Sequence, residues 1–261
     1  MRYKLLIDYE MELDVVIDYI DLFILFVIYS FLGWVLETAY ASFNAKKFVN
    51  RGFLTGCFCP IYGFGAVLTV ETFKGINNYI QDDGLFTFVG ICTAVVFVTV
   101  LEYITGFVLE KIFHCKWWDY SDNYANIKGY ICLSYSLLWG VLVYVLIEAV
   151  NPVIMGFVTH VSQRIKLYIG AVLLCYFIGD TVKSIIDALG LREVVLNYSK
   201  FSIPVYDKKI KQYKRFFFAF PRLMLLNMEI KNREIKYILT EKIDRMKNKV
   251  KEEIKNHQNF S

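Results

Sequence analysis

Hydrophobic residues gather along this chain in long runs, without the every-second-residue alternation that is typical of strands. Several runs extend over about 20 residues with few charges, which is the length that an α-helix needs to cross the hydrocarbon core of a bilayer. The pattern predicts five membrane spans, at about residues 19–43, 53–73, 85–109, 130–150 and 167–189. The expected fold is therefore all-α: a polytopic transmembrane helical bundle.

Polar stretches divide the chain into three parts. Residues 1–18 alternate apolar and acidic positions, with no continuous apolar region behind a basic start, and so predict a surface segment rather than a cleavable signal peptide. Residues 19–189 form the predicted transmembrane domain, in which Asn151-Pro152 is expected to end the fourth span. Residues 190–261 form a tail, where apolar residues at helical spacing predict an amphipathic helix: Ile235, Leu239, Ile243, Met246, Val250 and Ile254.

Charge is distributed unevenly between the spans and the tail. Residues 190–261 hold 17 Lys+Arg against 8 Asp+Glu, whereas residues 1–189 hold 12 against 17. A basic tail after the last span predicts an anionic neighbour, and membrane lipid is favoured over nucleic acid. Basic and aromatic residues alternate in blocks between positions 208 and 221, which favours contact with that lipid surface.

The same basic residues predict an orientation. Five spans place the two ends of the chain on opposite sides of the membrane. If the tail lies inside, the loops that carry Lys46, Lys47, Arg51, Lys111, Lys116 and Lys128 also lie inside. Because basic residues accumulate on the cytoplasmic side, we expect the N-terminus outside and the C-terminus inside. The paired Trp117 and Trp118 of the loop 111–129 suit a membrane–water interface.

Residues 51–65 are unusual for the start of a span, because they hold four glycines and a proline: Gly52, Gly56, Pro60, Gly63 and Gly65. These residues let the backbone leave the helix or let helices approach closely. One interpretation is a broken helix whose backbone groups line a ligand cavity. The other is a packing face, in which Gly52 and Gly56 have the small-xxx-small spacing of close helix contacts.

Ionisable residues inside the predicted spans are the second unusual feature. Glu37, Glu102 and Asp180 are expected at similar depths, each at a cost of at least about 2.5–3.5 kcal/mol near the bilayer centre. One interpretation is a shared polar cavity that opens inward, for which the candidate binding residues are Glu37, Arg51, Tyr62, Glu102, Asp119 and Asp180. The alternative is local pairing: Glu37 with Arg51, Asp180 with Lys183, and Glu102 with a tyrosine or with Arg51.

Other chemistry is sparse in the sequence. The six cysteines fall mostly in apolar spans and predict small packing residues, so neither a disulfide framework nor a metal site nor a cofactor is expected. The three histidines are not grouped with a serine or cysteine nucleophile. The phosphate-binding pattern Gly-x4-Gly-Lys-Ser/Thr is absent from the sequence, so an ATP-driven role would need a separate subunit.

Four ordered groups of residues allow comparison with a known family. They are Arg51-Gly52-Phe53-Leu54, Gly56 and Pro60-Ile61-Tyr62-Gly63-x-Gly65; Leu101-Glu102-Tyr103-x-Thr105-Gly106-x-x-Leu109-Glu110; Trp118-Asp119-Tyr120-Ser121; and Asn126-x-x-Gly129-x-Ile131-Cys132-Leu133 followed by Trp139-Gly140. This set resembles the bacterial family of putative ABC transporter type IV permeases over about residues 20–190. The resemblance implies a membrane subunit of a transporter in the bacterial cytoplasmic membrane. The missing nucleotide-binding pattern, the small number of spans and the glycine-lined faces predict that it works with a separate ATPase or as a homo-oligomer.

Two other functions are compatible with the sequence. One is an intramembrane enzyme that acts on a lipid or a lipid-linked substrate, with Glu102 or Asp119 as the acid or base. The other is a membrane scaffold that recruits partners through its tail. A transport role is expected over an enzymatic one, since no grouped catalytic set is visible in the sequence.

Overall fold

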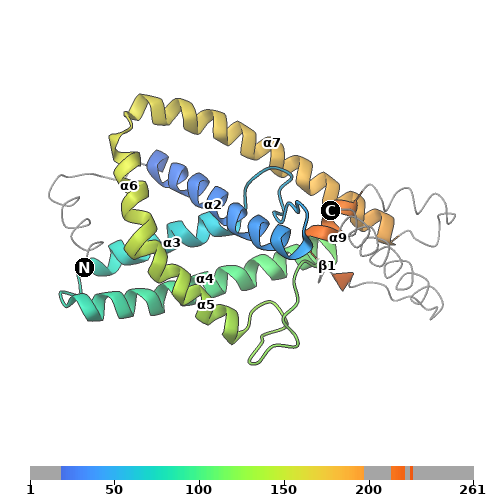
Figure 1. Cartoon of the computed structure of the whole chain (residues 1–261), viewed down its shortest axis with the longest axis horizontal. Helices are drawn as coiled ribbons and strands as arrows, with labels where there is room; N and C mark the ends of the chain where they lie inside the picture. Colours follow the sequence, from blue (N-terminus) through green and yellow to red (C-terminus); the bar gives the residue numbers. More distant parts are fainter. Residues whose placement is uncertain (1–18, 197–212, 221–223, 226–261) are drawn as a thin grey trace, which may run out of the picture.

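The computed structural model describes residues 19–196, 213–220 and 224–225. The predicted surface segment 1–18, Lys208, Lys209 and Lys211, and the predicted amphipathic helix beyond residue 222 lie outside the described residues, apart from the pair 224–225. The helices are α2 (Tyr19–Ala45), α3 (Pro60–Asn77), α4 (Asp83–Phe113), α5 (Leu133–Val145), α6 (Asn151–His160), α7 (Gln163–Leu196) and the short α9 (Lys214–Ala219). The helices α2, α3, α4 and α7 run roughly along the long axis of the molecule, whereas α5 and α6 cross it at a steep angle (Figure 1).

The predicted all-α membrane bundle is confirmed, with four candidate spans among the described residues where five were predicted. These four helical stretches are long and apolar enough to cross a membrane: Tyr19–Ala45, Asp83–Phe113, Leu133–His160 and Gln163–Glu193. The shorter α3 is not among these four; it packs between α2 and α4, while α7 packs along α2. The helices are accompanied by one small antiparallel ladder between β1 (Cys115–Lys116) and β2 (Met224–Leu225).

The second span begins later than predicted. The predicted helix from Phe53 instead starts at Pro60, and residues 46–59 form no helix. Proline suits the first turn of a helix because its missing N–H would have no partner there. The prediction of non-helical backbone is therefore confirmed for residues 51–59, which connect α2 to α3, whereas Gly63 and Gly65 lie within α3. Gly52 and Gly56 lie outside any helix, so the prediction that they form a helix-packing face is wrong.

The fourth span also differs from the prediction. Asn151-Pro152 does not end it, because the π-helical turn Leu146–Val150 joins α5 directly to α6. The wider turn accommodates the missing N–H of Pro152, and Asn151 is held by the Tyr29 hydroxyl, which donates to its Oδ1 at 2.7 Å. Residues 153–160, which were expected to lie beyond the end of the fourth span, thus continue it.

Gly63 and Gly65 give a matched test of the contact between α2 and α3. A Cβ on Gly63 would lie 2.5 Å from the backbone oxygen of Phe26 and even closer to Ser30 Oγ, whereas a Cβ on Gly65 would meet only Val98, at 3.7 Å. We expect Gly63→Ala to lower the free energy of unfolding by about 1–3 kcal/mol, because overpacking forces the helices apart. Gly65→Ala should leave the thermal midpoint in detergent nearly unchanged. Equal midpoints for the two variants would contradict this close approach.

Candidate functional site

The helix α3 is preceded by an irregular stretch, residues 50–59, which we call the entry segment. Its amides and carbonyls need partners, because unpaired backbone groups are costly away from water. The Asn50 side chain supplies several: its Oδ1 accepts from Trp34 Nε1 at 2.9 Å and from the Gly52 amide at 3.1 Å. Its Nδ2 donates to the carbonyls of Thr55 at 2.8 Å and Gly56 at 3.2 Å. Asn50 therefore ties the entry segment to α2.

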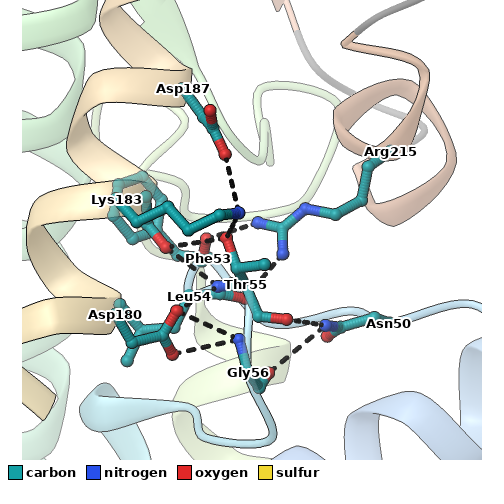
Figure 2. Close-up of polar contacts among 10 residues, drawn as sticks. Asn50, Phe53, Leu54, Thr55, Gly56, Asp180, Lys183, Asp187 and Arg215 are labelled. Carbon is teal, nitrogen blue, oxygen red and sulfur yellow. Dashed lines mark hydrogen bonds and ion pairs between the residues drawn. The ribbon is translucent and has the colours of Figure 1, made fainter. Parts of the chain in front are cut away.

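Asp180 of α7 holds the opposite side of the entry segment (Figure 2). The amide of Thr55 donates to its Oδ1 at 3.1 Å, and the amide of Gly56 donates to its Oδ2 at 3.0 Å. The Thr55 amide also donates to Ser184 Oγ at 2.8 Å. Lys183 pairs with Asp187 at 3.3 Å, so the predicted Asp180–Lys183 pair is wrong. Asp180 instead satisfies backbone amides of a segment that is remote in sequence.

A second polar group, which we call the carboxylate network, lies between α2, α3, α4 and α5. It consists of Glu37, Arg51, Tyr62, Glu102, Tyr120 and Trp139. The Tyr62 hydroxyl donates to Glu37 Oε1 at 2.6 Å, and Arg51 Nε lies 3.5 Å from Glu37 Oε2. The Tyr62 and Trp139 rings are 5.5 Å apart between centroids, which connects the Glu37 side of the network to the Glu102 side. The expected pair of Glu37 with Arg51 is thus present.

Glu102 is the most buried member of the carboxylate network, at 5% exposure in the middle part of α4. Trp139 Nε1 donates to its Oε2 at 3.0 Å, and the Tyr120 hydroxyl donates to its Oε1 at 3.3 Å. The Tyr120 hydroxyl holds its proton at neutral pH and can donate, and burial, together with the charge of Glu102, raises its pKa further from neutral. The expected tyrosine partner of Glu102 is present, and Arg51 pairs with Glu37 instead.

Asp119 lies in the loop after α4, where it organises a tight turn. Its Oδ1 accepts from Ser121 Oγ at 2.7 Å and lies 3.4 Å from Lys116 Nζ. Desolvation opposes ionisation here, but the hydrogen bonds from Ser121 and the charge of Lys116 outweigh it and lower the pKa of Asp119. Gly129 closes the same turn with φ +72°, and any Cβ there would clash with Asp119. Asp119 therefore stabilises its own loop and is not a member of the carboxylate network.

The structure divides the six predicted site residues into three groups. Glu37, Arg51, Tyr62 and Glu102 come together in the carboxylate network, Asp180 binds the entry segment, and Asp119 binds its own loop. Trp139 and Tyr120 complete the network. In the sequence they are distinguished only by their places in the motifs Trp118-Asp119-Tyr120-Ser121 and Trp139-Gly140. Trp117 is buried at 3% exposure against Phe53 and Phe113, so its ring packs inside the protein. Among the described residues, no group of three His, Cys, Asp or Glu side chains could hold a metal ion.

These features define a class: an integral membrane helical protein with an irregular entry segment before α3 and a carboxylate network inside its bundle. The family model described as "Putative ABC-transporter type IV" matches residues 24–185. The chain belongs to that family. The match includes the entry segment and every member of the carboxylate network. No curated protein and no solved structure matches the chain.

Proposed function

We propose that the chain is the membrane subunit of an ABC-type transporter and that the carboxylate network forms part of its transport path. The observation that carries this proposal is Glu102. Its carboxylate is buried in a membrane-spanning helix and receives hydrogen bonds only from the neutral donors Trp139 and Tyr120 among the described residues. Ionisable groups within spans are expensive, and they typically mark ion and substrate pathways.

Charge and backbone geometry around Glu102 support this function. Glu37 and Glu102 contribute two carboxylates to the network, whereas Arg51 contributes the one guanidinium, and it pairs with Glu37. The network therefore favours a cation or a proton over an anion as its occupant. The entry segment is the non-helical connection between α2 and α3, and its Arg51 is a member of the network. Irregular backbone of this kind is tolerated inside a membrane only where it is buried in protein or lines a cavity.

The orientation proposed for the chain places the entry segment, β1 and α9 on the cytoplasmic side. These elements gather at one end of the bundle (Figure 1), and they include or adjoin the basic residues Lys46, Lys47, Lys111, Lys116 and Arg215. Positive-inside accumulation supports this assignment. A cysteine introduced at the exposed Asn78, next to the buried Asn77, should be labelled by an impermeant thiol reagent in intact cells, whereas one at Asn123 should be labelled only after permeabilisation. Labelling of the Asn123 position in intact cells would reverse the orientation.

A transporter of this kind needs an ATPase, and we propose that a separate chain supplies it. Purification from native membranes in a mild detergent should recover a second subunit that carries a phosphate-binding loop, and ATP hydrolysis should require both chains. The side chains of Tyr124 and Ile127 are exposed on the loop between α4 and α5. Changing both to alanine tests whether this loop contributes to the contact with the ATPase. Recovery of a stable single chain without an ATPase in more than one detergent would contradict the proposal and favour an enzyme or a scaffold.

A further inference from the structure

The short helix α9 belongs to the tail in sequence, yet it packs into the same end of the bundle as the entry segment. Phe216 is 2% exposed and Ala219 is fully buried. The Trp117 ring lies 5.3 Å from the ring of Phe216 and 5.1 Å from that of Phe53, between centroids. The expectation that this basic and aromatic stretch lies on lipid is therefore wrong for Phe216. One aromatic cluster joins α9 to the entry segment.

Arg215 makes the direct polar connection between α9 and the entry segment. Its Nη2 donates to the Phe53 carbonyl at 2.7 Å and its Nη1 donates to the Leu54 carbonyl at 2.8 Å, so that one guanidinium holds two consecutive carbonyls (Figure 2). A planar guanidinium is suited to such two-pronged contacts, which a lysine would not reproduce. The amides of the next two residues, Thr55 and Gly56, are held by Asp180 on the other side of the turn. Residues 53–56 are thus fixed by side chains from both α7 and α9.

The entry segment also reaches the carboxylate network. Arg51 precedes Phe53 by two residues, and it makes the ion pair with Glu37. Cys59, at the other end of the segment, is 7% exposed and directly precedes α3, whose Tyr62 donates to Glu37. A change in the position of residues 53–56 would therefore act on both contacts of Glu37.

We propose that α9 is a latch: through Arg215, the C-terminal tail holds the entry segment in place and thereby positions Arg51 against Glu37. Displacement of α9 releases the carbonyls of Phe53 and Leu54, loosens the segment and alters the carboxylate network. Arg215 is a positioning residue in this scheme, because it acts on the network through the segment. Its significance for transport rests on the proposed function, whereas the mechanical coupling itself does not.

The test uses Cys59 as a reporter within the segment. In the full chain, with the other five cysteines replaced by alanine, the rate of maleimide labelling of Cys59 is compared between the parent and Arg215→Gln. Burial raises the pKa of the Cys59 thiol to about 12; the nearby charge of Glu37 adds to this effect and that of Arg51 opposes it. Because the thiolate is the reactive form, Cys59 of the parent should react slowly. Loss of two charge-assisted hydrogen bonds should accelerate labelling about tenfold, since local opening becomes more frequent.

Two controls separate local release from general unfolding. Cys132, which is 2% exposed at the start of α5, is the reporter in a parallel single-cysteine chain, and Lys111→Gln removes an exposed charge from the same end of the bundle. The proposal requires faster labelling of Cys59 alone, in Arg215→Gln and, more weakly, in Arg215→Lys. Unchanged labelling of Cys59, or an equal increase at Cys132, would overturn it. Neither result depends on transport or ATP hydrolysis, so a failure of the proposed function would be recognised separately.

Discussion

Replacement of Lys166 by alanine is expected to lower the free energy of unfolding by about 3–5 kcal/mol, because it leaves a buried carboxylate without its counter-charge. Lys166 Nζ lies 2.8 Å from Asp21 Oδ1, and the two side chains are only 4% and 7% exposed. The pair joins the first turns of α7 and α2, at the end of the bundle away from α9 (Figure 1). Equilibrium unfolding in mixed detergent, or a steric-trap assay in bilayer discs, measures the loss.

Lys183→Ala is a matched control for Lys166→Ala, because both lysines lie on α7. Lys183 pairs with Asp187 at 3.3 Å, but these side chains are 60% and 41% exposed. Exposed ion pairs contribute about 0–1 kcal/mol, so Lys183→Ala should change stability little. Adding Asp21→Asn to Lys166→Ala should restore part of the loss, since it removes the charge that was left unpaired. Equal destabilisation by Lys166→Ala and Lys183→Ala would mean that the buried pair does not secure α2 to α7.

Glu102→Gln is expected to abolish function while leaving the amount of folded protein nearly unchanged. Glutamine has the same shape and its side-chain oxygen still accepts a hydrogen bond from Trp139 or Tyr120, but the negative charge is lost. If Glu102 binds a cation or a proton along a transport path, the variant should behave like a deletion of the gene. The measurements are the deletion phenotype and, in the purified complex, ATP hydrolysis, each compared with the thermal midpoint of the variant.

Glu71→Gln is the appropriate control for Glu102→Gln. Glu71 lies on α3 with its side chain 47% exposed, and it pairs with Lys74 at 3.6 Å outside the carboxylate network. This variant should retain both function and stability. If Glu102→Gln instead causes a large loss of folded protein, the carboxylate holds the bundle together and does not serve a transport path. Normal function in a stable Glu102→Gln protein would equally contradict the proposal.

Sequence reasoning succeeded where the determining interactions are local. The glycines and Pro60 predict a break in the second span because they change the backbone at their own positions, and the structure begins α3 at Pro60. The burial of Glu102 follows from its place within an apolar run. The pair of Glu37 with Arg51 could be anticipated because Glu37 lies near the end of α2 and Arg51 lies in the connection that follows it. These inferences required no knowledge of how distant helices pack.

The predictions that were wrong concern residues whose surroundings depend on how distant helices pack. Helical spacing predicts a pair of Asp180 with Lys183, whereas in the structure Asp180 accepts hydrogen bonds from backbone amides 124 and 125 residues away. Asp21 and Lys166 showed no sign of partnership, since only the packing of α2 on α7 brings them together. Asn151-Pro152 was wrongly expected to end a helix, because a local rule does not anticipate a π-helical turn or the Tyr29 contact. Tertiary structure decided each of these cases.

The dependence of the entry segment on α7 has a consequence for synthesis of the chain. The amide of Thr55 is separated from its acceptor Asp180 by 125 residues. At elongation rates of about 5–20 residues per second, that acceptor emerges roughly 6–25 s after Thr55 itself. During this interval the amides of Thr55 and Gly56 need water or the insertion machinery as a substitute, because hydrocarbon offers them no partner. The amides of Thr55 and Gly56 therefore gain their final acceptor only after residue 180 has been synthesised, so the structure around the entry segment is completed last although the segment itself is made early.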